Sequence, residues 1–372
     1  MPLLVISFDG ISDTVFEEMA QSGQFPSISR FKGNSTYVGG VKTVFVSNTY
    51  PIHTSVSTGK LPKDHGITSN ILQSMGHSND KWAQLESLIK SKTIWQAAKE
   101  KGLKTAAFLW PVTCGAKINY HIPEVHLLKS QNRILSQLKH GSKLFQLKLF
   151  LKYRKQLAKI QNIETSQPTL DNFITASVAS LLKKKKPSLT LVHLIAYDTI
   201  CHEVGPNDND KLYLAKKAMD DNLAKLLRVW KGDILIFSDH SQLSVNETIN
   251  LNVLYNSNFV QMGGCAFGNN VPLNLENQYF FGRYLTKEEM HESGYAGIFA
   301  FGIAAKSGFS FGEKPVKGDH GYPTTYENYN TFYAINKEID YKHKLKNSVL
   351  DVTAIIAKEL GIDMDILQQY DM

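Results

Sequence analysis

The feature that most constrains the fold is a series of short, continuously apolar runs separated by stretches with helical spacing. The runs are "LLVISF", "TAAFLW", "LTLVHLIAY", "ILIFS" and "GIFAFGIAA", at residues 3–8, 105–110, 189–197, 234–238 and 297–305. Because they are apolar throughout rather than alternating, they predict strands that are buried on both faces. Residues 92–102, 169–186 and 208–232 carry helical spacing between them. This alternation predicts an α/β fold with a mostly parallel central sheet.

Composition is consistent with one globular α/β domain over residues 1–372. The chain is 42% hydrophobic and 20% charged, which is enough apolar material for a sizeable core. No apolar run approaches the ~20 residues that a membrane helix needs, and the short apolar run after Met1 lacks the features of a signal peptide. We therefore expect a cytoplasmic protein. Three cysteines, Cys114, Cys201 and Cys265, have no paired spacing and are expected as small buried side chains.

Two segments interrupt the alternation, and we expect both to be insertions that cover an edge of the sheet. Residues 127–165 are predicted to form one or two basic amphipathic helices broken near Gly141. The stretch 127–163 holds nine Lys or Arg and no acid, whereas the whole chain has a net charge of +7. Residues 245–292 are rich in Asn, Gly and Tyr and are expected near the active site. The basic insertion has three open interpretations: a solvated or subunit-contact face, a contact with an anionic substrate, or a contact with an anionic membrane surface.

Acidic residues and histidines follow three of the predicted strands. Asp9, Asp198 and Asp239 each come shortly after an apolar run, with His202 and His240 beside two of them, and His320 lies in the glycine-flanked "GDHGYP". In an open α/β sheet the carboxyl ends of the strands meet at one rim, where ligands bind. Carboxylates and imidazoles bind Zn²⁺, and two ions ~4 Å apart would use the whole set. Four other histidines are expected to be scaffold or surface residues: His53, His65, His126 and His193.

The pieces "VISFDGI", "NTYPIHTSVSTGKLPKDHGITSN", "YDTICHEVGP", "FSDHSQL" and "GDHGYP" resemble, in this order, the alkaline phosphatase superfamily and, more narrowly, its nucleotide pyrophosphatase/phosphodiesterase branch. The resemblance implies an alkaline-phosphatase-like three-layer sandwich with a mostly parallel central sheet, helices on both faces and cap insertions. It implies one zinc ion held by Asp198, His202 and His320. It implies a second zinc ion held by Asp9, Thr49, Asp239 and His240. The chain departs from the family pattern at Ile52 and Ser241.

The resemblance also implies that Thr49 is the nucleophile, and that Asn70 and the backbone amide of Tyr50 contact the phosphoryl oxygens. Thr49 stands just before Pro51, a residue that suits the first turn of a helix, and a helix N-terminus favours an anion. Coordination to zinc lowers the pKa of a hydroxyl and activates it. We expect a covalent phospho-threonine-type intermediate that water then hydrolyses. Two in-line steps predict net retention at phosphorus.

The expected activity is that of a two-metal phosphodiesterase or nucleotide pyrophosphatase, with zinc as the ion and manganese as the alternative. The segment "LWPVTCGAKINY" resembles the diesterase segment, and no Lys or Arg lies between Trp110 and Ala116. That favours a small phosphodiester, nucleotide or nucleotide-sugar substrate, with Lys117 as the nearest cation. A phosphomonoesterase, a phosphonate hydrolase, a phosphoryl transferase on the same metal core and a silent binding module stay open. Specific nucleic-acid binding is not expected, and the oligomeric state is open.

Overall fold

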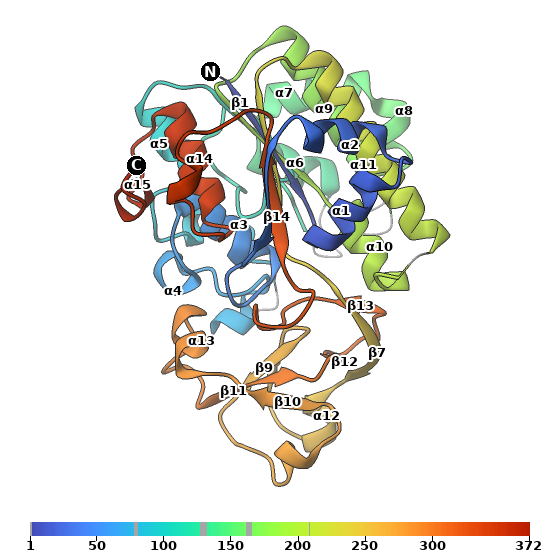
Figure 1. The fold of residues 1–372 in the computed structure, drawn as a ribbon, viewed down its shortest axis with the longest axis vertical. Helices are drawn as coiled ribbons and strands as arrows, with labels where there is room; N and C mark the ends of the chain where they lie inside the picture. Colours follow the sequence, from blue (N-terminus) through green and yellow to red (C-terminus); the bar gives the residue numbers. More distant parts are fainter. Residues whose placement is uncertain (1, 78–80, 127–131, 161–165, 208) are drawn as a thin grey trace.

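The computed structural model describes residues 2–77, 81–126, 132–160, 166–207 and 209–372. A seven-stranded sheet forms its centre (Figure 1). In spatial order the strands are β2 (Thr36–Val41), β14 (Thr331–Ile335), β6 (Asp233–Ser238), β1 (Leu3–Phe8), β5 (Leu189–Leu194), β3 (Thr105–Phe108) and β4 (Tyr120–Ile122). The strand β14 is antiparallel to both of its neighbours, and the other pairs are parallel. The predicted mostly parallel sheet is therefore confirmed.

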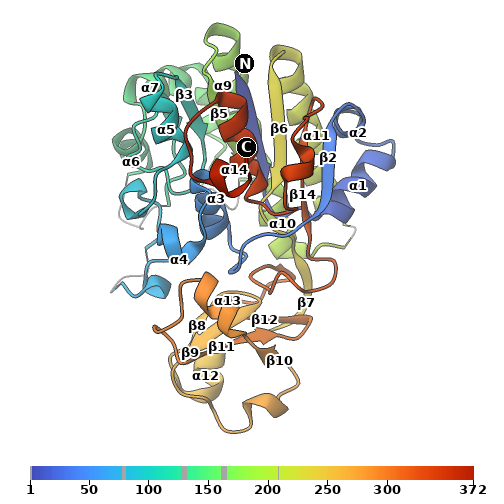
Figure 2. The same cartoon turned by 60° about the vertical axis from the view of Figure 1, so that its left-hand side comes forward.

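Helices cover both faces of this sheet (Figure 2). In β1, Leu4 and Ile6 face one hydrophobic core, whereas Leu3 and Val5 face the other. The first core is covered by α1 (Asp13–Gln21), α2 (Pro26–Gly33), α9 (Thr169–Lys184) and α11 (Asp210–Val229). The second is covered by α3 (Thr49–Thr58), α5 (Ile94–Glu100), α14 (Asp351–Leu360) and α15 (Ile366–Gln369). Because each strand contributes to two cores, its sequence is apolar without alternation, and the three-layer sandwich is confirmed.

The predicted helices 92–102, 169–186 and 208–232 correspond to α5, α9 and α11, each slightly shorter than expected; residue 208 lies outside the described residues. The remaining short elements of the sandwich are α4 (Pro62–His65) and α10 (Ala196–Val204), with 3-10 turns at Gln73–Met75, Glu86–Leu88 and Lys342–Lys344. Cys114, Cys201 and Cys265 are buried, as predicted. In the described ranges no helix is both long and apolar enough to cross a membrane.

A smaller unit lies below the carboxyl ends of the strands, drawn in orange in Figure 1. It contains an antiparallel sheet of β10 (Phe281–Tyr284), β11 (Phe301–Ala305), β9 (Cys265–Gly268) and β8 (Val260–Gln261). It also contains β12 (Gly308–Phe311), β7 (Leu243–Ile249) and β13 (Gly318–Asp319), the helices α12 (Leu251–Tyr255) and α13 (Lys287–Glu292), and a 3-10 turn at Leu275–Asn277. We call residues 243–319 the lower unit; it includes the whole predicted segment 245–292 and extends beyond it.

The assignment of residues 297–305 to the central sheet is wrong. Residues 301–305 form β11, which pairs with β9 and β10 in the lower unit. Ile303 and Ala305 face one apolar cluster of that unit, and Ala304 faces another. The run is thus apolar on both faces for the same physical reason as a central strand, so its pattern does not reveal which sheet it joins. The central sheet is completed instead by β2, β4 and β14, and β14 is buried throughout.

The basic insertion lies beside the edge strand β4. Its described part forms α6 (Arg133–His140), α7 (Lys143–Lys152) and α8 (Arg154–Leu157), while residues 127–131 and 161–165 of the predicted segment lie outside the described residues. The helices α6 and α7 meet at Gly141, where a Cβ would lie 2.8 Å from the carbonyl oxygen of His121 in β4. The absence of a side chain there lets the turn approach the strand closely. Tyr153 Oη donates to the Ala176 carbonyl oxygen at 2.9 Å and ties the segment to α9.

Candidate active site

Three aspartates meet at the carboxyl ends of adjacent strands. Asp9 follows β1 directly, Asp239 follows β6, and Asp198 lies in the first turn of α10 after β5. Because β1 pairs with both β5 and β6, the three carboxylates converge at one rim, as the sequence predicts. The Gly10 N–H donates to Asp239 Oδ1 at 3.2 Å. Gly10 has a φ of +74°, and a Cβ there would lie 3.0 Å from Asp198 Oδ1, so this position requires glycine.

Thr49 is the first residue of α3, and its Oγ1 lies 3.4 Å from His240 Nε2. The helix therefore begins at Thr49, two residues before Pro51. The Tyr50 N–H donates to Asn70 Oδ1 at 2.9 Å, so Asn70 does return to the N-terminus of this helix. The other predicted site residues lie at the same rim, and the structure brings all eight together in one region.

Each of the three histidines at the rim has its Nδ1 beside an oxygen that can accept a hydrogen bond but cannot donate one. The pairs are His240 Nδ1 with Ser241 O at 3.2 Å, His202 Nδ1 with Gly318 O at 2.8 Å, and His320 Nδ1 with Asn48 Oδ1 at 2.8 Å. These contacts place the proton on Nδ1 and the lone pair on Nε2. Histidines that bind metal ions are commonly oriented in this way by a second partner.

Around His240 the donor atoms are arranged as a cation would require. His240 Nε2 lies 3.3 Å from Asp9 Oδ1 and 3.4 Å from Asp239 Oδ2, in addition to its contact with Thr49. Asp9 Oδ1 and Asp239 Oδ2 are buried and, among the described residues, have no hydrogen-bond partner. A nitrogen lone pair beside two buried carboxylate oxygens is unfavourable unless a cation lies between them. The residues present therefore fit a divalent metal ion.

A second group of donors adjoins the first. Ligand atoms of Asp198, His202 and His320 lie within 4.8 Å of one another, and so do those of Asp9, Asp198 and His240. The two groups share Asp198. His202 Nε2 lies 3.5 Å from Asp198 Oδ2, and the rings of His202 and His320 have centroids 5.1 Å apart. Two adjoining groups of carboxylate and imidazole donors suit a pair of ions such as Zn²⁺.

The pKa values of the donor groups also favour a metal ion. Burial, together with repulsion from Asp198 and Asp239, raises the pKa of the Asp9 carboxyl well above its usual value. Burial and the neighbouring His240 and His202 lower the pKa of His320 well below its usual value. A neutral imidazole is the form that binds a metal ion. A divalent ion would also stabilise the ionised form of Asp9.

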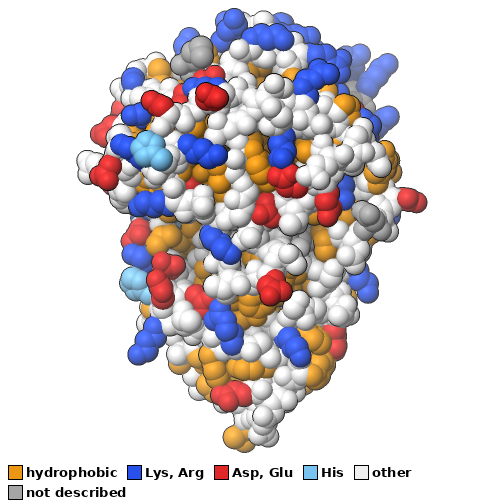
Figure 3. All heavy atoms as spheres, viewed as in Figure 1, with side chains coloured by type: hydrophobic (Ala, Val, Ile, Leu, Met, Phe, Trp, Pro, Cys, Tyr) orange, Lys and Arg blue, Asp and Glu red, His pale blue; other side chains and the backbone are white. Residues whose placement is uncertain are grey.

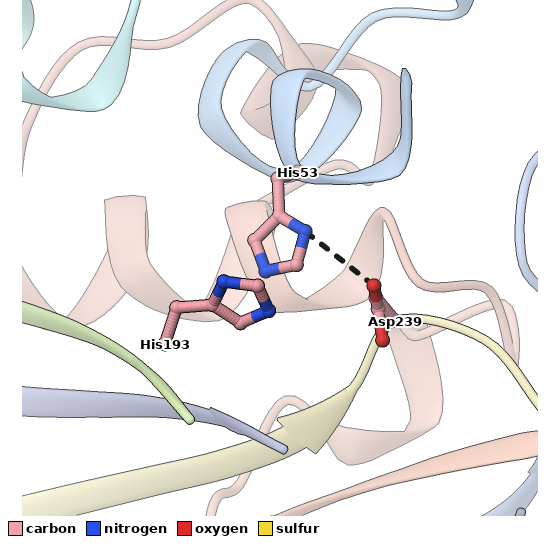
Figure 4. Close-up of side chains that lie close together, drawn as sticks. All are labelled: His53, His193 and Asp239. Carbon is pink, nitrogen blue, oxygen red and sulfur yellow. Dashed lines mark ion pairs between the residues drawn. The ribbon is translucent and has the colours of Figure 1, made fainter. Parts of the chain in front are cut away.

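Two further histidines, His53 and His193, lie close to Asp239 (Figure 4). His53 Nδ1 lies 2.9 Å from the Thr49 carbonyl oxygen and 3.5 Å from Asp239 Oδ2, while its Nε2 contacts Ser7 Oγ at 3.0 Å. His193 Nε2 lies 3.0 Å from Asp9 Oδ2. Because the Nδ1 proton of His53 is directed at the Thr49 carbonyl, that nitrogen offers no lone pair to a metal ion at Asp239. These histidines instead hold the backbone of Thr49 and the carboxylate of Asp9 in place.

A cavity of about 380 Å³ opens over the donor groups. Its lining adds, beyond the metal-binding candidates and Thr49, the residues Tyr50, Asn70, Trp82, Glu124, His126, Ile195, Thr199 and Lys314. The rings of Trp82 and His126 stack with centroids 3.6 Å apart and planes 5° apart. His126 Nε2 contacts Glu124 Oε1 at 2.8 Å. Lys314 is an exposed residue that reaches the cavity from the lower unit.

Tyr50 and Asn70 were predicted from the sequence, whereas the other lining residues were missed for identifiable reasons. Glu124 and His126 follow the carboxyl end of β4 just as the aspartates follow their strands, but β4 has only three residues and gives no recognisable apolar run. Trp82 and Lys314 come from loops with no local signal. The segment from Trp110 to Ala116, which resembles the diesterase segment, contributes no residue to the lining of the cavity. Trp110 is buried, and its Nε1 donates to Ser57 Oγ at 2.9 Å beneath α3; Lys117 is exposed elsewhere.

The fold and the site together define a metal-dependent hydrolase of the alkaline phosphatase superfamily. Residues 3–292 match the model of the family described as type I phosphodiesterase / nucleotide pyrophosphatase. The chain belongs to this family.

Individual relatives are more distant. The chain is 22% identical to the bis(5'-adenosyl)-triphosphatase of Pongo abelii, over 97% of this chain and 78% of that protein. It is 30% identical to ectonucleotide pyrophosphatase/phosphodiesterase family member 1 of Homo sapiens, over 37% of this chain and 16% of that protein. The human bis(5'-adenosyl)-triphosphatase is 24% identical, and the chain spans only 49% of its length.

Solved structures share the fold over almost the whole chain. Murine ectonucleotide pyrophosphatase/phosphodiesterase 5 has a TM-score of 0.64 at 16% identity, covering 98% of this chain and 96% of that chain. The same murine protein has also been solved as an inactive threonine-to-alanine variant in complex with AMP. Phosphonoacetate hydrolase from Sinorhizobium meliloti, in complex with phosphonoformate, has a TM-score of 0.69 at 15% identity, covering 97% of this chain and 96% of that chain. At such identities the likeness establishes the fold alone.

Proposed function

We propose that this protein is a two-metal phosphodiesterase or nucleotide pyrophosphatase in which Thr49 is the nucleophile. One observation carries the proposal: Thr49 Oγ1 lies at the N-terminus of α3, 3.4 Å from His240 Nε2, and Thr49 lines the same cavity as Asp9, Asp198, His202 and His320. A hydroxyl at this position can be activated as a nucleophile by a neighbouring metal ion. The N-terminus of the helix also favours the negatively charged phosphoryl group. Membership of the phosphodiesterase family supports the hydrolysis of a phosphoric ester.

Two groups of residues would hold the ions. The first comprises Asp9, Thr49, Asp239 and His240, and the second comprises Asp198, His202 and His320. The lone pairs on Nε2 and the unpartnered buried carboxylate oxygens support this assignment. When bound, two divalent ions, zinc or alternatively manganese, supply Lewis acidity that lowers the pKa of a coordinated hydroxyl or water and offsets negative charge on the phosphoryl oxygens.

The protein's own groups orient the reaction. Thr49 Oγ attacks phosphorus in line, the leaving group departs opposite, and a phospho- or nucleotidyl-threonine forms; water then displaces the threonine in a second in-line step, with net retention. Asn70 Oδ1 is occupied by the Tyr50 amide, so Asn70 Nδ2 is the group that donates to a phosphoryl oxygen. Such oriented donors stabilise the charge of the transition state. His53 holds the Thr49 carbonyl and thereby fixes the direction of the hydroxyl.

The lining of the cavity favours a substrate with a second charged phosphate. Lys314 is the one cation among the described lining residues, and it would face a phosphate or another anion beyond the reacting phosphorus. Tyr50, Trp82 and His126 supply ring surface on the wall that also holds Asn70. A nucleotide, dinucleotide or nucleotide sugar with a pyrophosphate bond matches both features. The AMP complex of the murine relative and the bis(5'-adenosyl)-triphosphatase relatives support this substrate class.

The deciding experiment compares substrates on zinc-loaded protein with Thr49→Ala as the control. The substrates are a dinucleoside polyphosphate, bis(p-nitrophenyl) phosphate, p-nitrophenyl phosphate and phosphonoacetate. We expect turnover of the pyrophosphate and the diester to exceed that of the monoester, and Thr49→Ala to lose about 10³-fold or more. Comparable diester activity in Thr49→Ala would remove Thr49 as the nucleophile. Preference for the monoester or the phosphonate would establish the corresponding alternative, and phosphorylation of an added alcohol would establish a transferase. Elemental analysis near one ion per chain would contradict the two-metal model.

A further inference from the structure

The helix α7 carries apolar side chains on two opposite faces. Phe145, Leu149 and Phe150 pack against the core of the sandwich. Leu144, Leu147 and Leu151 lie on the other face and are exposed by 77%, 42% and 68%. Their spacing of three and four residues places them in one stripe along the helix. The fold leaves this leucine stripe without a partner among the described residues.

Lysines border the leucine stripe on both sides. At 100° per residue, Lys148 and Lys152 fall on one flank of the stripe and Lys143 on the other, and all three are exposed. No acidic residue occurs between positions 132 and 160. A short amphipathic helix with an exposed apolar stripe between lysines is typical of elements that lie in the interface of an anionic membrane.

A basic groove begins where α7 ends. It has a volume of about 370 Å³ between α7, α9 and α11, and its cations are Lys152, Lys183, Lys184, Lys225 and Arg228. Lys152 Nζ donates to Ser180 Oγ at 2.8 Å and Lys225 Nζ donates to Asn222 Oδ1 at 3.2 Å. Within the described ranges none of the five cations pairs with a carboxylate. Five cations around one hollow without counter-charges form a site for anions.

The basic groove and the leucine stripe lie away from the candidate active site. Lys183 and Lys184 stand just before β5, and Arg228 stands just before β6, at the amino ends of these strands. Lys and Arg side chains gather along the upper edge in Figure 3, the end where α7 and α9 lie in Figure 1. No described residue of the basic insertion lines the 380 Å³ cavity. The described residues of the insertion therefore do not contact the substrate. A ligand bound at the leucine stripe and the basic groove would leave the catalytic cavity open.

The leucine stripe and the basic groove together favour one kind of binding partner. A nucleic acid would use the cations but leave the leucine stripe in water. A second copy would bury the leucines but bring two groups of like charge together. An anionic bilayer satisfies both features, because its phosphates meet the lysines while its acyl region receives the leucines. We propose that this end of the molecule docks on a membrane surface that contains anionic lipid, with the leucine stripe entering the lipid and the basic groove binding headgroup phosphate.

The test is a flotation assay with phosphatidylcholine vesicles, with and without phosphatidylserine. We expect the full chain to bind only the vesicles that contain phosphatidylserine. Two triple variants should each weaken the partitioning at least tenfold: Leu144→Gln with Leu147→Gln and Leu151→Gln, and Lys183→Gln with Lys184→Gln and Arg228→Gln. Thr49→Ala should bind vesicles like the unaltered protein, so that failure of the docking proposal and failure of the proposed chemistry are distinguishable.

Matched controls change the same residue types elsewhere on the surface. Val253→Gln with Leu254→Gln and Leu273→Gln alters exposed apolar side chains of the lower unit. Lys99→Gln with Lys117→Gln and Lys342→Gln alters exposed lysines outside the groove. Both controls should bind vesicles like the unaltered chain, and melting temperatures should be similar for the leucine, lysine and control variants because their altered side chains are exposed.

Several results would overturn the proposal. They are equal binding to phosphatidylcholine alone, undiminished vesicle binding in the leucine variant, and binding to RNA without binding to vesicles. A dimer that is lost with the leucine variant would assign the stripe to a second copy. Tight binding of free pyrophosphate in the groove, with no dependence on the leucines, would assign the groove to soluble phosphates.

Discussion

The backbone amide of Tyr50 donates a hydrogen bond to Oδ1 of Asn70 across 2.9 Å. This contact joins the first turn of α3 to a loop residue twenty positions later. It fixes the Asn70 carboxamide so that its oxygen is used within the protein and its nitrogen is the group available to a ligand. The side chain of Asn70 therefore has a defined direction at the cavity before any substrate arrives.

Replacing Asn70 separates these two functions. Asn70→Asp keeps an oxygen for the Tyr50 amide but loses the Nδ2 donor and adds negative charge, whereas Asn70→Ala loses both. We expect kcat/KM to fall about 10²-fold or more in both variants, with the aspartate variant at least as impaired, because removing one oriented donor costs about that much. Steady-state kinetics on a diester measures this. Recovery of activity in Asn70→Asp would show that Asn70 acts only by holding the Tyr50 amide.

His53 is expected to be a positioning residue for Thr49. In His53→Asn the amide nitrogen takes the place of Nδ1 and still reaches the Thr49 carbonyl, whereas His53→Leu has no donor. We expect His53→Leu to lower kcat about tenfold or more with little change in KM, and His53→Asn to restore much of the loss. If the two variants are equally impaired and equally destabilised in urea, the contact of His53 is only structural.

Lys314 is expected to govern the preference for a second phosphate. Lys314→Ala should raise KM for a dinucleoside polyphosphate about tenfold, because a charge-assisted contact is lost, while bis(p-nitrophenyl) phosphate should be affected little. Lys317→Ala is the matched control, since this exposed lysine of the same loop does not line the cavity. An equal effect of Lys314→Ala on both substrates would contradict the assignment.

Removal of the metal ions should destabilise the fold. Ions that bind only the folded protein at a thousand times their Kd add about 4 kcal/mol to the free energy of unfolding. A chelator should therefore lower the melting temperature, and added zinc should restore it. His202→Ala combined with His320→Ala should largely remove the response, whereas His291→Ala, at an exposed position of α13, should keep it. A full response in the double variant would place the ions elsewhere.

His65 should make stability depend on pH below neutrality. Burial lowers the pKa of His65 from 6.5 to about 3, and its ring contacts Ser55 Oγ and the Ile67 amide. Below pH 6.5 the unfolded chain binds a proton that the folded protein does not, so the free energy of unfolding falls by about 1.4 kcal/mol per pH unit. Between pH 7 and pH 5 this contribution is about 2 kcal/mol. Urea unfolding at both pH values should show that His65→Gln loses less stability on acidification than the unaltered chain; an unchanged difference would contradict this.

The central strands β1, β3, β5 and β6 and the rim were predictable because they rest on local rules, whereas β2, β4 and β14 were not predicted. A continuously apolar run followed by Asp9, Asp198 or Asp239 carries both the strand and its chemistry in a few adjacent residues. Residues 301–305 obey the same rule of burial on both faces, yet they belong to another sheet, since a run of this kind reports burial and not the identity of the neighbours. The residues that form the wall of the cavity were not predictable because no local sequence pattern marks them. Glu124 and His126 follow β4, which is too short to give a recognisable apolar run in the sequence. Lys314 lines the cavity only because the lower unit folds against it.

The lower unit leaves the sandwich after β6 and returns at β14, and these two strands are hydrogen-bonded neighbours. The lower unit is therefore an insertion between two neighbouring strands, so its length and sequence can change while the register of the sheet is kept. The lower unit contains Lys314 and ends immediately before His320, whereas Thr49 and the three aspartates belong to the sandwich. Residues 243–319 thus form one continuous segment that brings Lys314 to the cavity, and we expect a chimaera that carries the corresponding segment of a relative to differ in substrate preference while it keeps Thr49.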